Sequence, residues 1–223
     1  MGQEADVSVY DALHATVEQD EGAKGRAVYA ALFRAMLGLI ARRGSTSVLE
    51  VGCGSGLFAE MLIRQAGVAY RGFDFSPAGV AHARARLPEA TLSVGDALSP
   101  ESYAGTYDCI VCSEVLEHIP GDLDAVALWP SGTFCVCSVP NFDYPTHVRL
   151  FRTEQQVRER YGQALDIQTV IRIPASARAG RPLAEYVRRL IWTRSDPRKL
   201  LGMLGVNAFD WNAGWFVFAG VRR

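Results

Sequence analysis

The sequence lacks the features that place a protein in a membrane or mark it for export. Its 223 residues contain no run of about 18 apolar residues, the length that a membrane-spanning helix needs. The first residues, MGQEADVSVYDALH, hold neither the basic segment nor the apolar stretch of a secretory signal. No repeat or low-complexity tract interrupts the chain. We therefore expect a cytoplasmic protein without a membrane partner.

An excess of charge of either sign is also absent. The net charge is −1, which argues against a surface dominated by nucleic-acid contacts. The distribution is uneven, because the stretch from Arg172 to Lys199 contains eight basic and two acidic residues and carries +6. A solvated helix face explains such a stretch, and an anionic partner is the alternative.

Cysteine is scarce, and its positions argue against disulfides and against zinc. The five cysteines are Cys53, Cys109, Cys112, Cys135 and Cys137. Most of them lie in apolar, strand-like runs, where free cysteine behaves as a small buried hydrophobe. In a strand, positions 109 and 112 point to opposite faces, so core packing is a better interpretation than a four-thiolate zinc site.

Strand-like and helix-like segments alternate along the chain. The patterns predict strands over about 47–51, 70–74, 90–94, 107–112, 133–139, 165–173 and 214–220. They predict helices over about 25–43, 57–65, 77–86 and 153–161, the last with a capping box at Thr153. This alternation predicts a single α/β domain over 1–223, with a helical cap over 1–44. An insertion over 174–213, with helices at 183–191 and 197–204, is expected to be a lid between the last two strands.

Three glycines at a spacing of two separate the first strand from its helix. Gly52, Gly54 and Gly56 allow a tight turn and let backbone approach a ligand at a helix N-terminus. A dinucleotide fingerprint needs its third glycine at position 57, which is leucine. The loop therefore predicts a small-molecule site and argues against a nicotinamide oxidoreductase.

Four motifs in succession resemble those of the class I S-adenosylmethionine-dependent methyltransferases. They are VLEVGCGSG, GFDFS, VGDAL and YDCIVCSEVLEHI, and the resemblance covers about residues 46–152. It implies a Rossmann-like α/β fold with a seven-stranded, mainly parallel sheet in the order 3-2-1-4-5-7-6 and helices on both faces. The last strand is then antiparallel, and the cofactor is S-adenosylmethionine with S-adenosylhomocysteine as product.

The same resemblance implies which residues hold the cofactor. Gly52 to Gly56 are expected beside its methionine part with Glu50 nearby, Asp74 at the ribose and Phe75 beside the adenine. Asp96 and Ala97 are expected at the adenine edge, and Ser113 with Glu114 between cofactor and acceptor. The expected cofactor-binding set is Glu50, Gly52, Gly54, Gly56, Asp74, Phe75, Asp96, Ala97 and Ser113.

The stretch SEVLEHIP, residues 113–120, brings acid and base side chains to the rim after the fourth strand. One helical turn would place Glu114 on the face that carries Glu117 and His118. His118 is the leading candidate for a general base, with Glu114 and His147 as further catalytic candidates. Thr146 to Thr153 resembles a stretch of ubiquinone-type and sugar-type O-methyltransferases, so we expect methyl transfer to an oxygen, or a nitrogen, of a small molecule.

Alternatives to a metal-free small-molecule enzyme stay open. Glu114, Glu117, His118 and His147 resemble the metal ligands of small-RNA 2′-O-methyltransferases, and two carboxylates with two imidazoles suit Mg²⁺ or Mn²⁺. RNA would then be the acceptor, with the +6 stretch against phosphate. A non-catalytic cofactor-binding module is the third hypothesis. The helix before the fifth strand is short, at about two turns over 122–128, and a homodimer or the insertion would cover the sheet there.

Overall fold

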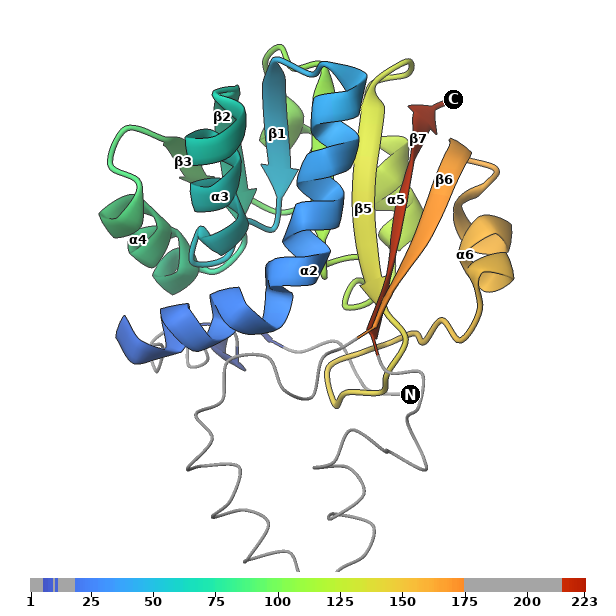
Figure 1. The fold of residues 1–223 in the computed structure, drawn as a ribbon, viewed down its shortest axis with the longest axis horizontal. Coiled ribbons are helices and arrows are strands. Elements are labelled where there is room, and N and C mark those ends of the chain that lie inside the picture. Colours follow the sequence, from blue (N-terminus) through green and yellow to red (C-terminus); the bar gives the residue numbers. More distant parts are fainter. Residues whose placement is uncertain (1–5, 10, 12–18, 175–213) are drawn as a thin grey trace, which may run out of the picture.

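The fold is a twisted sheet of seven strands with helices on both faces (Figure 1). A computed structural model describes residues 6–9, 11, 19–174 and 214–223, with side chains of the N-terminal helix from Tyr29 onward. The helices expected at 183–191 and 197–204 lie outside the described residues, as do residues 1–5, 10 and 12–18 of the expected helical cap. No helix in the described ranges combines the length and apolar character that crossing a bilayer requires.

The strands follow the predicted positions closely. They are β1 Ser47–Val51, β2 Ala69–Asp74, β3 Thr91–Val94, β4 Cys109–Ser113, β5 Phe134–Pro140, β6 Leu165–Pro174 and β7 Gly214–Arg222. The helices are α2 Gln19–Arg43, α3 Leu57–Ala66, α4 Pro77–Arg86, α5 Asp122–Ala127 and α6 Glu154–Tyr161, with a 3-10 turn η1 Pro100–Tyr103. Helix α2 begins six residues before the predicted start. Its first turns are polar, so no apolar periodicity marks them as helical, but they contain no proline that would prevent a helix.

The strand order is β3-β2-β1-β4-β5-β7-β6, which confirms the predicted topology. Strands β1 to β5 pair in parallel, and β7 runs antiparallel to both β5 and β6. All parallel strands therefore end at one edge of the sheet. Because β7 is reversed, its first residues lie at that same edge, where Trp215 pairs with Pro140.

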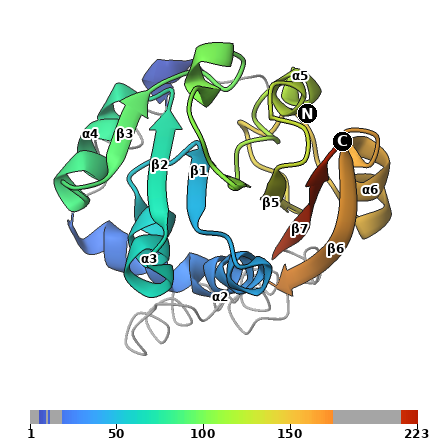
Figure 2. The same cartoon turned by 90° about the horizontal axis from the view of Figure 1, so that it is seen from above.

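Helices pack on both faces of the sheet (Figure 2), and a hydrophobic layer lies beneath them on each face. Helices α2 and α3 cover one face, where Leu32, Met36 and Ile40 repeat every four residues on one side of α2 and are fully buried. Each such side chain contributes about 1.5–3 kcal/mol through burial. The other face packs against η1, α5 and α6 through residues such as Tyr103, Val126 and Tyr161.

The short helix over the fifth strand matches its prediction. Helix α5 has six residues, and the fully buried Val126 together with Trp129 fills the layer that a longer helix would fill. Helix α6 starts with the predicted capping box, in which the Thr153 hydroxyl accepts from the Gln156 N–H. Within this chain, therefore, α5, Trp129 and α6 already bury the sheet face there.

The cysteines are free thiols inside the core. Cys109 belongs to the layer under α2, whereas Cys112, Cys135 and Cys137 belong to the opposite layer. The prediction that positions 109 and 112 point to opposite faces is confirmed. Burial raises the pKa of each thiol, so these side chains stay protonated packing groups.

Candidate functional site

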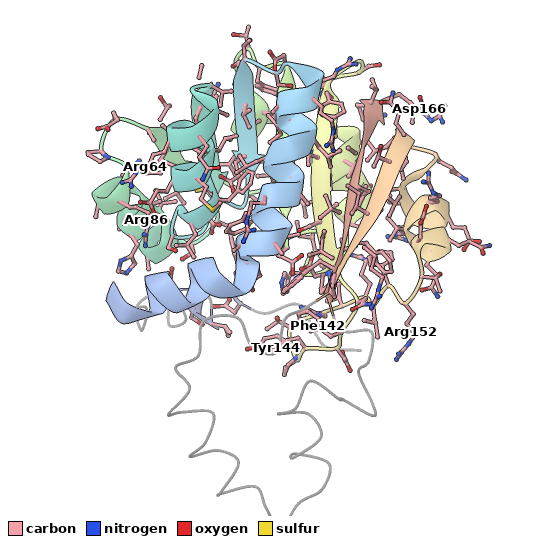
Figure 3. All side chains as sticks on the ribbon, in the orientation of Figure 1. Arg64, Arg86, Phe142, Tyr144, Arg152 and Asp166 are labelled. Carbon is pink, nitrogen blue, oxygen red and sulfur yellow. The ribbon has the colours of Figure 1, made fainter. Side chains whose placement is uncertain are left out.

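A cavity of about 990 Å³ opens at the carboxyl ends of the parallel strands. Its wall combines the glycine loop after β1, the end of β2, the turn after β3, the stretch after β4 and the loop after β5. Ligands in open α/β sheets bind outside the carboxyl ends of the strands. Figure 3 labels Phe142 and Tyr144 of the loop after β5 at this end of the molecule, and Asp166 at the opposite end.

The first glycine of the loop is required by both backbone and space. Gly52 has a φ of 71°, and a Cβ atom there would lie 2.3 Å from Cγ2 of Val115. The N–H groups of Gly52 and Cys53 both donate to the carbonyl of Phe73, at 2.9 and 3.0 Å. A side chain at position 52 would therefore separate the loop from the stretch that follows β4.

Gly56, the third glycine of the loop, lies against helix α4 rather than in the cavity wall. Gly56 starts α3 with a φ of 78°, and a Cβ there would lie 3.2 Å from Cβ of Ala83 on α4. Gly52 and Gly54 line the cavity together with Glu50, whereas the described cavity wall does not include Gly56. Gly56 therefore brings α3 and α4 together.

Asp74, at the end of β2, organises the polar end of the cavity. Its Oδ2 accepts from the Gly54 N–H at 2.8 Å, and its Oδ1 accepts from the Ser76 N–H at 2.9 Å. The side chain is 6% exposed and lines the cavity. A carboxylate has about four acceptor positions, so oxygens that hold the loop can still accept from ribose hydroxyls.

The neighbouring part of the cavity wall is apolar and exposed. Phe75, Val94 and Leu98 line it, and they are among the few large hydrophobic side chains that are exposed, at 40%, 52% and 42%. Asp96 and Ala97 lie in the same wall, and the Asp96 carboxylate accepts from the Leu98 N–H at 2.8 Å. A planar ring bound here would cover apolar surface that otherwise faces water.

Glu50 is a buried acid held by a tyrosine. The Tyr70 hydroxyl donates to Glu50 Oε2 at 2.6 Å, in the space that Gly72 leaves by having no side chain. Burial raises the pKa of Glu50 to about 8, and the hydrogen bond from Tyr70 only partly opposes this. A cationic group beside Glu50 would restore its charge.

The helical turn considered for Glu114 does not form. Glu114 has a φ of 58°, in the left-handed region, and the chain bends there directly after β4. Its Oε1 accepts from the Ser138 hydroxyl at 2.8 Å and its Oε2 from Trp215 Nε1 at 2.6 Å, and Ser113 and Ser138 hydroxyls lie 2.9 Å apart. The Glu114 carboxylate thus bridges Ser138 on β5 and Trp215 on β7 rather than lying beside His118 on a helix. Burial raises its pKa to about 8.

Glu117, His118 and His147 form a cluster at the other end of the cavity. One ligand atom from each lies within 4.8 Å of the others, and Glu117 Oε1 is 3.6 Å from His118 Nε2. His118 Nδ1 is 3.1 Å from the carbonyl of Thr146, and His147 Nδ1 is 3.1 Å from that of Phe142. If each Nδ1 carries the proton, each Nε2 keeps a lone pair for a proton or a cation.

Burial shifts the pKa values of all three residues in this cluster away from their usual ranges. Glu117 is fully buried, and neither of its carboxylate oxygens has a hydrogen-bond partner. Burial and the nearby Glu114 raise the pKa of Glu117 well above its usual range. Burial lowers the pKa of His118 to about 4, and it also lowers the pKa of His147. Both imidazoles are therefore neutral at pH 7. The cluster holds three of the four residues in the alternative metal set, and Glu114 lies apart from it.

Several residues that shape the site were not among the sequence candidates. Ser138 and Trp215 fix Glu114, and Tyr70 fixes Glu50. Ser138 could have been found, because it lies near the end of β5, directly opposite Ser113, the last residue of β4. Trp215 could also have been found. The last strand is expected to be antiparallel, so its first residues should lie at the cavity edge. No sequence pattern marked Tyr70.

These residues fit S-adenosylmethionine. Glu50 and the glycine loop suit a charged amino acid end, Asp74 suits a ribose, and the exposed wall at Phe75 suits an adenine ring. The bound cofactor would supply a methyl group on a sulfonium, and these residues would hold and orient it.

Comparison with known proteins agrees with this assignment. Residues 22–169 match a family described as a methyltransferase domain. A ubiquinone biosynthesis O-methyltransferase of Thiobacillus denitrificans is 39% identical over 85 residues, which cover 36% of each chain. The match thus spans about a third of the length of this curated relative.

Solved structures share the fold at low sequence identity. One is the methyltransferase in a complex with the Haloferax volcanii Trm112 methyltransferase activator, with a TM-score of 0.70 and 18% identity over 96% of this chain and 97% of that one. Another is a Haemonchus contortus phosphoethanolamine N-methyltransferase 2 with S-adenosylhomocysteine bound, with a TM-score of 0.62 and 17% identity over 98% of this chain and 60% of that one. The chain belongs to the methyltransferase domain family and is an S-adenosylmethionine-dependent methyltransferase of class I.

Proposed function

We propose that this enzyme transfers the methyl group to an oxygen of a small, uncharged acceptor. One observation carries the proposal: Glu117, His118 and His147 lie in the wall of the same cavity as the glycine loop and Asp74. Methyl transfer from a sulfonium needs alignment of donor and acceptor, and a hydroxyl acceptor also needs to lose its proton. The name of the Thiobacillus denitrificans relative, an O-methyltransferase, supports the same reaction class.

The composition of the wall supports an uncharged acceptor with an apolar body. No lysine or arginine is found among the described residues that line the cavity. Tyr29, Phe33, Phe142 and Tyr144 line its acceptor end beside the two histidines. The Tyr144 and Phe142 rings lie 5.6 and 5.8 Å from the His147 ring. Such a wall favours burial of an apolar or ring-shaped acceptor, and its described part has no cationic side chain to pair with a phosphate or carboxylate of that acceptor.

We assign His118 as the base for the acceptor hydroxyl. Its imidazole is neutral at pH 7 and part of the cavity wall, so it can accept a proton. Glu114 and His147 are then supporting groups, and Glu114 keeps the stretch after β4 in place through Ser138 and Trp215.

A metal-dependent version of the same reaction is the second candidate. The unpartnered oxygens of Glu117 favour it, because a buried carboxylate without a hydrogen bond is costly unless something neutralises it. Two neutral imidazoles and one carboxylate are a common ligand set for divalent cations, and such a cation would lower the pKa of an acceptor hydroxyl. RNA as acceptor has weaker support, because the described part of the cavity wall has no lysine or arginine to pair with phosphate.

A labelled-methyl assay tests these proposals. We expect transfer to hydroxylated aromatic or sugar-like small molecules, and no transfer to an RNA pool. Each reaction is run with and without chelator, and chelator sensitivity would favour the metal-dependent version. Methylation of RNA alone, or of amines alone, would contradict the proposal. Binding of S-adenosylhomocysteine in a thermal-shift assay without transfer to any acceptor would favour a cofactor-binding module.

A further inference from the structure

Arg149 connects the two chain segments that carry the cluster. It follows His147 by two residues, and its guanidinium reaches across to the stretch after β4. Its Nη1 donates to the carbonyls of Leu116 and Ile119, and its Nη2 donates to the carbonyl of Pro120 at 2.9 Å. One side chain therefore binds carbonyls on both sides of Glu117 and His118.

Beyond Glu114, which Ser138 and Trp215 hold, the stretch after β4 has few backbone hydrogen bonds of its own. It is a turn rather than a helix, with one turn bond from the His118 N–H to the carbonyl of Val115. The Glu117 carbonyl accepts from the Val148 N–H, at 2.9 Å. Of the five carbonyls from Leu116 to Pro120, three thus depend on Arg149 and one on its chain neighbour.

The buried carboxylate of Asp122 forms an ion pair with Arg149. Asp122 is fully buried, and its Oδ1 lies 3.2 Å from Arg149 Nη2. Arg160 Nη2 and the Tyr161 hydroxyl bind the same carboxylate, at 2.5 and 2.9 Å. The Arg149 side chain is 16% exposed, so its position is set by the protein rather than by water.

We propose that Arg149, anchored by Asp122, is a positioning residue that holds Glu117 and His118 in register with His147. This rests on the proposed function of the cluster. The planar guanidinium has five N–H donors in a fixed arrangement, and Arg149 uses them on four acceptors. A lysine at this position keeps the charge but has three donors and no plane, so it cannot make all four contacts.

The test compares Arg149→Met and Arg149→Lys with Arg160→Met. Arg160 shares Asp122 but donates to none of the three carbonyls, so it is a matched control. We expect both Arg149 variants to lose about 10- to 100-fold in kcat with the Kd for S-adenosylhomocysteine unchanged. Arg160→Met is expected to lower Tm and to leave kcat unchanged. Equal kcat losses in Arg149→Lys and Arg160→Met, or none in Arg149→Lys, would overturn the proposal.

A second measurement needs no acceptor. The imidazole NMR signals of His118 and His147, assigned by single alanine variants, report the local geometry directly. We expect them to shift in Arg149→Lys and to stay in place in Arg160→Met, and unchanged signals in Arg149→Lys would contradict the positioning role. If the signals shift but the wild type methylates no acceptor, the proposed function fails while the positioning role stands.

Discussion

Glu117 and His118 are neighbours in the chain, and Oε1 of the first lies 3.6 Å from Nε2 of the second inside the cavity. That distance is too long for a hydrogen bond, and the carboxylate has no other hydrogen-bond partner. A proton or a cation between these two atoms would satisfy both. The predictions for the acceptor end of the site follow from this pair.

Replacing His118 tests its role as base. We expect His118→Ala to lower kcat about 100-fold or more, because a positioned base contributes roughly 10²- to 10⁴-fold, while S-adenosylhomocysteine binding is retained. His82→Ala, on α4 and away from the cavity, is the control and should keep full activity. Since the pKa of His118 is lowered to about 4, wild-type kcat should stay level between pH 7 and pH 5.5. An acid-side fall centred near 6.5 would contradict the lowered pKa of His118.

The cation hypothesis is tested by binding rather than by turnover. If Glu117, His118 and His147 hold a divalent cation, Mn²⁺ or Mg²⁺ should raise Tm of the wild type. Glu117→Gln and His147→Ala should each weaken that binding at least about tenfold, since even the loss of an outer partner of a ligand costs this much. His82→Ala again serves as the control. Calorimetry that detects no binding of either ion to the wild type would eliminate the metal-dependent version.

Asp74→Asn tests the polar end of the cavity. The two carboxylate oxygens accept from different N–H groups, those of Gly54 and Ser76. The asparagine side chain has only one oxygen, so its NH₂ group would face one of these two N–H groups. An unpaired buried donor costs about 1–3 kcal/mol, so we expect the Kd for S-adenosylhomocysteine to rise about tenfold or more. Asp166→Asn, on the exposed far end of β6, is the matched control (Figure 3). Equal affinity of the two variants would show that Asp74 has no part in cofactor binding.

Glu50 predicts a pH dependence of stability. Its pKa is raised to about 8 in the folded protein, so the folded state binds more protons than the unfolded state between pH 4.5 and 8. The stability that it contributes is fully present below about pH 4.5 and is lost as the pH rises toward 8. Relative to Glu50→Gln, the wild type should lose about 2–3 kcal/mol between pH 5 and pH 7, measured by urea unfolding without cofactor. A pH-independent difference between the two proteins would contradict the buried, neutral state of Glu50.

The sequence predicts most of the fold because the fold depends on local patterns. The apolar runs and the glycine loop predict the strands and helices to within a few residues, and the resemblance to class I methyltransferases implies the strand order. The site is less predictable, because its contacts join distant segments. Glu114 shows this: helical spacing suggested a place beside His118, but the left-handed backbone at this residue turns its carboxylate toward Ser138 and Trp215. Trp215 is about a hundred residues further along the chain, and no local pattern reports such a partner.

The reversal of β7 has a consequence for how this enzyme can diversify. Pro174 at the end of β6 and Gly214 at the start of β7 are register partners, so the segment 175–213 leaves and re-enters the sheet at one point, at the cavity edge. The entropy of closing such an excursion grows only slowly with its length. A connection of different length between these two residues can therefore be accommodated without disturbing the strand order.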